Sequence, residues 1–172
     1  MRVKTLVIIP TYNEPENIRE LLSQVLAVDQ NLEVLVVDDN SPDKTSNVVR
    51  SIPEFDQRVH LVVREKKNGL GRAYIHGFKW ALSKEYDWIT QMDADLSTML
   101  KVRTLADVVV GSRWVSGGGT INWDWFRKLL SRGGSFYSRW ILGYPLADWT
   151  GGFNMWKQEV LKALDLNTIY SE

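Results

Sequence analysis

The sequence predicts a single-domain α/β fold in which helices flank a mostly parallel central sheet. Apolar, β-prone runs alternate with helical patterns through the first 92 residues, and this order implies right-handed crossovers between parallel strands. The runs are almost continuously apolar, as is typical of parallel strands covered on both faces. Three of them end in polar or acidic turns. Because ligands of open α/β sheets bind outside the carboxyl ends of the strands, these turns are expected to form a functional edge.

The strands are expected where the apolar runs lie. The first two runs begin at Thr5 and Glu33 and end in the polar turns 10–14 and 38–43. The same pattern continues in three further strands, at residues 59–64, 87–92 and 106–111.

The helices are predicted between the strands, at residues 15–27, 44–52 and 71–83. In the first, Pro15 stands near the start, a position that tolerates its missing N–H. Ile18, Leu22 and Val25 then recur at helical spacing. Over residues 98–105 the pattern falters, and no regular element is predicted there.

The composition excludes several classes of protein. With 44% hydrophobic and 24% charged residues among 172, the chain can build one sizeable core. Its formal net charge is zero, so no general attraction to nucleic acid is expected. It has no cysteine and two histidines, which excludes disulfides and thiolate metal sites and argues against a histidine-rich centre. No apolar run reaches the roughly 18 residues of a membrane span.

An acidic pair follows the strand predicted at residues 87–92. Asp93 and Asp95 are separated by one residue at the strand's end. Mg²⁺ and Mn²⁺ prefer one or two carboxylates together with substrate phosphates, so this pair could hold a metal bound to a diphosphate. The alternative is turn and helix-cap chemistry, which also favours acidic residues.

Glycines mark two other loops. Gly69 and Gly71 precede a predicted helix, but the sequence around them lacks both the full dinucleotide fingerprint and the P-loop Lys-Ser/Thr. We expect a tight turn that lines a nucleotide pocket. The run of three glycines at 117–119 is compatible with a plain linker or with a functional hinge.

Seven motifs, in one order, resemble a known family. They are PTYNE (10–14), VVDDNSPD (36–43), GLGRAYIHGF (69–78), MDADLS (92–97), GSR (111–113), NWDWFRKLLSRG (122–133) and DWTGGF (148–153). Together they resemble the dolichol-phosphate mannose synthases and their bacterial polyprenol-phosphate relatives, within glycosyltransferase family 2.

This resemblance implies a GT-A type fold and an inverting sugar transfer from a nucleotide diphosphate donor to a polyprenyl or dolichyl phosphate. Mannose from GDP-mannose is the expected donor. The alternatives are a polyprenol-phosphate glucosyltransferase that uses a UDP-sugar, and a nucleotide-binding subunit that is inactive alone. Relatives carry a longer segment after Ser97 and continue beyond Glu172, so we expect residues 1–172 to be a single catalytic domain that lacks a loop and a C-terminal part.

The resemblance also implies roles for individual residues. The donor's base and ribose would be held by Pro10, Tyr12, Glu14, Val37 and Asp39. Its diphosphate would lie at Asp93, Ala94 and Asp95, with Mg²⁺ or Mn²⁺ bound by Asp93 and Asp95. Arg113 would also belong to the donor-binding set. The acceptor phosphate would be gripped by Arg113, Arg127 and Ser131. The catalytic set is Asp93, Asp95, Arg113 and Arg127.

Residues 125–142 combine apolar side chains at helical spacing with several cations. This composition suits a helix that lies in a membrane interface, although apolar stripes more often pack in a core. The pair Gly133 and Gly134 could break the helix into two. We therefore expect a membrane surface as a partner, with a peripheral location at the cytoplasmic face, and an anchoring partner or C-terminal anchor outside this chain.

Overall fold

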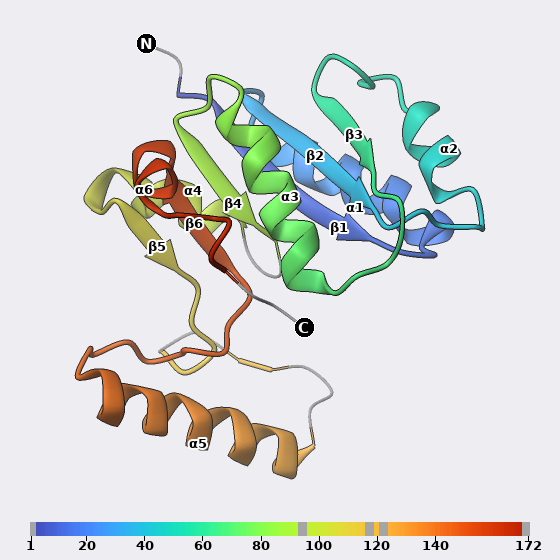
Figure 1. Cartoon of the computed structure of the whole chain (residues 1–172). Coiled ribbons are helices and arrows are strands. Elements are labelled where there is room, and N and C mark those ends of the chain that lie inside the picture. Colours follow the sequence, from blue (N-terminus) through green and yellow to red (C-terminus); the bar gives the residue numbers. More distant parts are fainter. Residues whose placement is uncertain (1–2, 93–95, 116–118, 121–123, 170–172) are drawn as a thin grey trace.

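A computed structural model describes residues 3–92, 96–115, 119–120 and 124–169. Its centre is a six-stranded sheet in the order β3-β2-β1-β4-β6-β5 (Figure 1). Four strands are parallel, namely β1 (Thr5–Thr11), β2 (Leu32–Asp38), β3 (Val59–Val63) and β4 (Trp88–Gln91). β6 (Asn154–Lys157) runs antiparallel between β4 and β5 (Val108–Val110). The prediction of a mostly parallel sheet in an α/β fold is confirmed.

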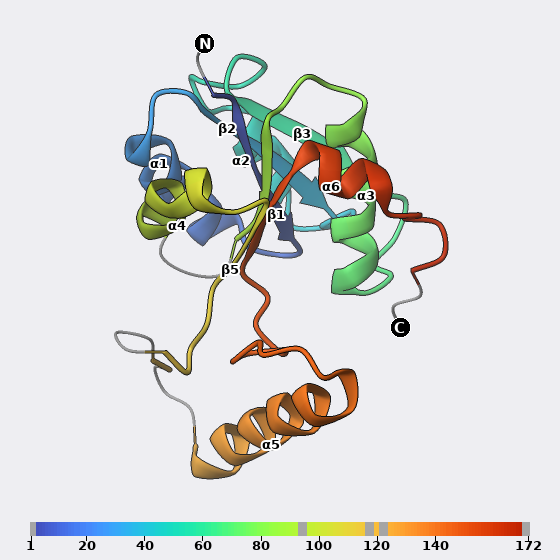
Figure 2. The same cartoon turned by 90° about the vertical axis from the view of Figure 1, so that its left-hand side faces the viewer.

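Helices cover both faces of the sheet (Figure 2). One face carries α1 (Pro15–Val28), α2 (Thr45–Arg50) and α4 (Leu96–Val102), and the other carries α3 (Leu70–Leu82) and α6 (Gln158–Ala163). Alternate residues of β1 divide between them, because side chains point to opposite faces of a strand. Val7 and Ile9 pack with α1, and Leu6 and Ile8 pack with α3. All four side chains are buried, which is why β1 reads as a continuous apolar run.

Four short elements escaped prediction. α4 and the 3₁₀ turn at Arg103–Leu105 occupy the segment expected to be irregular, and β6 and α6 follow the last motif. Each helix has only six or seven residues, less than two turns, so its sequence holds too little periodicity to detect. These helices are stabilised by tertiary packing, since Met99 of α4 packs into the core beside α1 and Leu161 of α6 packs into the core beside α3.

Helix α5 (Trp125–Leu142) stands apart from the sheet (Figures 1 and 2). The carboxylate of Asp124 caps its start by accepting a hydrogen bond of 2.7 Å from the Arg127 N–H. Gly143 ends it in the left-handed conformation, with φ of 66°. The pair Gly133 and Gly134 does not break it, so α5 is one continuous helix. Among the described residues, no helix is long and apolar enough to cross a membrane.

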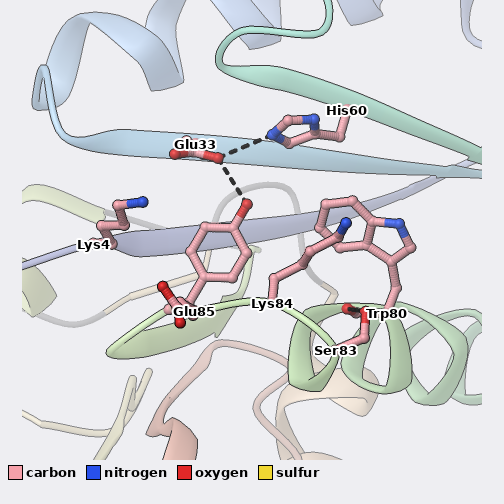
Figure 3. Close-up of a pocket in the computed structure, with 8 residues that line it drawn as sticks. Lys4, Glu33, His60, Trp80, Ser83, Lys84 and Glu85 are labelled. Atoms are coloured by element: carbon pink, nitrogen blue, oxygen red, sulfur yellow. Dashed lines mark hydrogen bonds and ion pairs between the residues drawn. The ribbon is translucent and has the colours of Figure 1, made fainter.

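A cavity of about 420 Å³ lies at the amino-terminal edge of the parallel strands. There the Glu33 carboxylate lies between Tyr86, whose hydroxyl donates to it at 2.7 Å, and the His60 ring nitrogen at 2.9 Å (Figure 3). Burial, reinforced by Glu33, raises the pKa of Tyr86 far above its ordinary value of 10.0, so the hydroxyl keeps its proton. The rings of His60 and Tyr86 also contact Trp80 of α3, with ring centres 5.2 and 6.4 Å apart, so this cluster joins the end of α3 to the sheet.

We predict that Gly77→Ala destabilises the fold. A Cβ at Gly77 would lie 2.7 Å from Ile8 Cγ2 and 3.4 Å from Val37 Cγ2, so α3 would have to move away from β1. Overpacking of this kind costs about 1–3 kcal/mol, measurable by urea unfolding. Gly133→Ala is the matched control, because nothing lies within 4 Å of its Cβ position, and alanine favours a helix by roughly 0.5–1 kcal/mol. Equal stability of the Gly77→Ala variant and the parent would contradict this packing.

Candidate active site at the carboxyl edge

Two polar loops meet at the carboxyl ends of β1 and β2. The Asn13 N–H donates to Ser41 Oγ at 3.0 Å, and the Glu14 N–H donates to Thr45 Oγ1 at 3.1 Å. The Asp39 N–H donates to the Thr11 carbonyl at 3.1 Å. These bonds bring together the two motifs to which the resemblance assigns the donor's base and ribose.

The predicted base-binding residues lie in different environments at this edge. Asp39 is buried and paired with Arg64, whose Nη1 lies 2.7 Å from its Oδ1. The Tyr12 ring is half-buried beneath the Lys67 ammonium, 4.1 Å from the ring centre. Pro10 is half-buried and Glu14 is exposed. Val37 differs, because its side chain is fully buried in the core beside α3, so only its main chain could reach a donor.

Gly69 shapes the entry to α3 at the same edge. Its φ of 90° lies in the region that side chains rarely adopt, so glycine is required there. Asn40, from the neighbouring motif, donates its side-chain amide to the Glu65 carbonyl at 3.1 Å. The structure therefore places the predicted tight turn beside the loop that carries Asp39.

The acidic pair Asp93 and Asp95, with Ala94 between them, lies outside the residues that the structure describes. β4, the strand before them, ends at Gln91 and pairs in parallel with β1. Their carboxylates suit an oxygen-loving divalent ion. Within the described ranges, no group of three or more acidic, histidine or cysteine side chains could hold a metal.

Arg113 lies three residues after the end of β5. It forms a two-pronged ion pair with Asp148, with Nε 2.7 Å from Oδ2 and Nη2 2.8 Å from Oδ1. The Asp148 side chain is fully buried. Burial alone would raise the pKa of Asp148, but the side-chain and backbone hydrogen bonds from Arg113, its charge and the Thr150 N–H outweigh burial and hold that pKa below its ordinary value.

Close chain crossing makes this ion pair possible. The Gly111 N–H donates to the Phe153 carbonyl at 2.8 Å, and a Cβ at Gly111 would lie 2.7 Å from Phe153 Cδ1. At Gly151, a Cβ would lie 3.0 Å from the Gly111 carbonyl oxygen. Glycine at these two positions lets the segments that carry Arg113 and Asp148 approach each other.

Thr150 connects this ion pair to α5. Its hydroxyl oxygen lies 2.7 Å from Arg113 Nη2 and 2.8 Å from Ser131 Oγ. Arg127 lies one turn before Ser131 on the same helix, and residues four apart share a helix face. The structure thus brings together Arg113 and Ser131, two of the three residues predicted to grip the acceptor phosphate. Sequence reasoning assigned no role to Asp148 or Thr150, and the only signal for them was the motif that contains both.

The chain is similar to known glycosyltransferases. The sequence profile described as "Glycosyl transferase family 2" matches residues 6–165. The chain is 41% identical to the undecaprenyl-phosphate mannosyltransferase of Micrococcus luteus, over 99% of this chain and 73% of that protein. It is 42% identical to the polyprenol monophosphomannose synthase of Mycolicibacterium smegmatis, over 98% of this chain and 67% of that protein.

A solved structure agrees with these relatives. The mannosyltransferase PcManGT from Pyrobaculum calidifontis, in complex with GDP-Man and Mn²⁺, matches 96% of this chain with a TM-score of 0.59 and 25% sequence identity. The matched part is 47% of that protein chain. Since the family profile spans residues 6–165 and the two bacterial relatives align over almost all of the sequence, this chain belongs to glycosyltransferase family 2.

Proposed function

We propose that this glycosyltransferase moves mannose, with inversion at the anomeric carbon, from GDP-mannose to the phosphate of a polyprenol. The observation that carries the proposal is the identity of 41% and 42%, across almost the whole chain, to two proteins named for polyprenyl-phosphate mannose synthesis. The GDP-Man bound in the structural neighbour supports the same donor.

The donor would bind at the carboxyl edge of the sheet. Tyr12 presents an aromatic face and Asp39 a carboxylate that can accept hydrogen bonds from a base, while Pro10, Glu14 and the main chain of Val37 complete the proposed set. Guanine offers two adjacent N–H donors, which match a carboxylate. Because Arg64 fixes Asp39, the carboxylate keeps one orientation, which favours a specific base over a general nucleotide fit.

Asp93 and Asp95 would hold Mg²⁺ or Mn²⁺ at the donor's diphosphate, beside Ala94. When bound, such a metal stabilises the negative charge that grows on the departing nucleoside diphosphate. The Mn²⁺ in the structural neighbour supports a divalent ion in the family.

The acceptor would be held by Arg113, Arg127 and Ser131. A phosphate monoester has a second pKa of about 6, so it is already largely ionised at neutral pH and needs no general base to become a nucleophile. The protein's task is to orient it, and guanidinium groups do this by forked hydrogen bonds to phosphate oxygens.

The exposed face of α5 fits a membrane that carries such a lipid. The face opposite Ser131 and Ser135 is apolar and open, with Phe136 at 73% and Trp140 at 77% exposure. Basic side chains line one flank of the same helix, at Lys128, Arg132 and Arg139. Aromatic residues beside cations suit an anionic lipid surface. We propose that α5 lies on the membrane and that the protein is peripheral there.

Removal of the divalent ion should abolish tight donor binding. In calorimetric titration with Mn²⁺, GDP should bind at least about tenfold more tightly than with chelator, or about 1.4 kcal/mol, and more tightly than UDP. Asp95→Ala should lose the metal effect. Asp107→Ala is the control, because that carboxylate is exposed in a surface ion pair with Lys157. Equal GDP affinity with Mn²⁺ and with chelator would refute the metal site.

Arg127→Ala should raise the KM for a short polyprenyl phosphate and leave the KM for GDP-mannose almost unchanged. A charge-assisted contact is worth about 1.5–3 kcal/mol, or roughly 10- to 150-fold. Lys128→Ala, the next residue on α5, should change neither constant with a soluble acceptor. A defect that falls on donor KM would contradict the assignment of Arg127 to the acceptor.

The double variant Phe136→Ser/Trp140→Ser should bind poorly to vesicles that contain anionic phospholipid. Each large apolar side chain contributes up to roughly 1.5–3 kcal/mol when fully buried, so together they should lower partitioning at least tenfold by this estimate. Leu105→Ser, at 81% exposure and outside α5, should sediment with vesicles like the parent. Membrane docking through α5 is wrong if the double variant does the same.

A further inference from the structure

The Thr150 hydroxyl lies where three functional groups converge. Its oxygen is 2.7 Å from Arg113 Nη2, 2.8 Å from Ser131 Oγ and 3.2 Å from Asp148 Oδ1. Two of these groups belong to the set proposed to bind the acceptor phosphate, namely Arg113, Arg127 and Ser131, which we call the acceptor clamp. Arg113 comes from the sheet and Ser131 from α5. We infer that Thr150, fixed by Asp148, is a positioning residue that holds Arg113 and Ser131 together as one phosphate-binding unit. The inference rests on the proposed function.

Asp148 holds both Arg113 and Thr150 in place. Its carboxylate accepts four hydrogen bonds of 2.7–3.1 Å. Three come from the N–H, Nε and Nη2 of Arg113, and the fourth comes from the Thr150 N–H. The Thr150 hydroxyl is a further, longer contact of 3.2 Å. The two bonds from Nε and Nη2 hold the guanidinium plane of Arg113 in a single orientation, and the third holds its main chain. The bond to the Thr150 main chain places the threonine side chain beside that plane. Because the Asp148 side chain is fully buried, water cannot easily compete for these hydrogen bonds.

The hydroxyl chemistry lets Thr150 prepare Ser131 for an anion. A threonine hydroxyl has one proton and two lone pairs. If it accepts from Arg113 and donates to Ser131 Oγ, the Ser131 proton is left to donate to a phosphate oxygen. In the other arrangement, Thr150 donates to Asp148 and Ser131 donates to Thr150. Rotation of two hydroxyl groups converts one arrangement into the other, without movement of the backbone.

The same segment sets the position of α5. The Trp149 N–H donates to the Ser135 hydroxyl at 3.2 Å, and Ser135 is buried. A Cβ at Gly134 would lie 3.8 Å from Thr150 Cγ2, so the helix approaches the loop closely at these small residues. The face of α5 that carries Ser131 and Arg127 is therefore held against residues 148–150, and Thr150 links the helix to the arginine of the sheet.

The test replaces the hydroxyl while keeping the shape. Thr150→Val should raise the KM for a short polyprenyl phosphate about tenfold, because the clamp is no longer prearranged. The KM for GDP-mannose and the kcat should stay within about twofold, as befits a residue that acts only on acceptor binding. Thr150→Ser should restore the parent value, and Thr104→Val, an exposed threonine in the 3₁₀ turn, should match the parent throughout.

A double-mutant cycle separates positioning from a merely structural role. If Thr150 acts partly through Ser131, Thr150→Val should cost less in a Ser131→Ala background than in the parent. Additive effects, an unchanged acceptor KM in Thr150→Val, or a loss that falls on donor KM would each overturn the inference while leaving the proposed function intact. If the parent transfers no mannose to polyprenyl phosphate, the proposed function fails and the inference fails with it. Thermal unfolding of each variant shows whether it folds like the parent.

Discussion

The buried ion pair between Arg113 and Asp148 is the interaction on which the arrangement of this site depends. It joins the end of β5 to the loop before β6, and through Thr150 it reaches α5. Removing charges from water is costly, and a well-packed apolar pair often stabilises a fold as well or better. Stability alone therefore does not explain these charges. The proposed role of Arg113, a cation that meets a phosphate in a fixed direction, would explain them, because the buried Asp148 carboxylate both pairs with the guanidinium and orients it.

The described residues proposed for donor and acceptor lie mostly on different parts of the molecule. Those proposed for the donor's base and ribose lie in β1 and β2 or in the loops that follow them, whereas Arg127 and Ser131, proposed for the acceptor, belong to a helix outside the sheet. α5 presents small polar residues to the body and aromatic residues to the outside. A lipid phosphate at the inner face and a membrane at the outer face would thus meet the same helix from two sides. The proposed membrane contact would explain why the aromatic face of this helix is not buried in the core.

Much of the fold was predictable, and the failures have physical causes. β1, β2 and α1 were predictable from the sequence. A strand that is buried on both faces is continuously apolar, and a helix that is buried on one face has apolar residues at helical spacing. β6 and α6 are too short to show either pattern. Asp148 and Thr150 went unassigned because their importance lies in contacts with Arg113 and Ser131, which are distant in sequence. The resemblance also assigned Val37 to the donor without indicating that its side chain packs into the core, so that assignment stays a prediction for its main chain.

The pKa of Asp148 bears on how the proposed binding of the acceptor phosphate would respond to acid. A carboxyl group with a lowered pKa stabilises the folded protein at all pH above its ordinary value, and that contribution is lost only as pH falls through the lowered pKa. Asp148 is such a group, so Arg113 keeps its orientation well below neutral pH. The acceptor's own phosphate loses its second charge near pH 6, by its usual pKa. With the proposed function, protonation of the lipid phosphate would therefore precede protonation of Asp148, and in mild acid the phosphate, rather than Asp148, would limit acceptor binding.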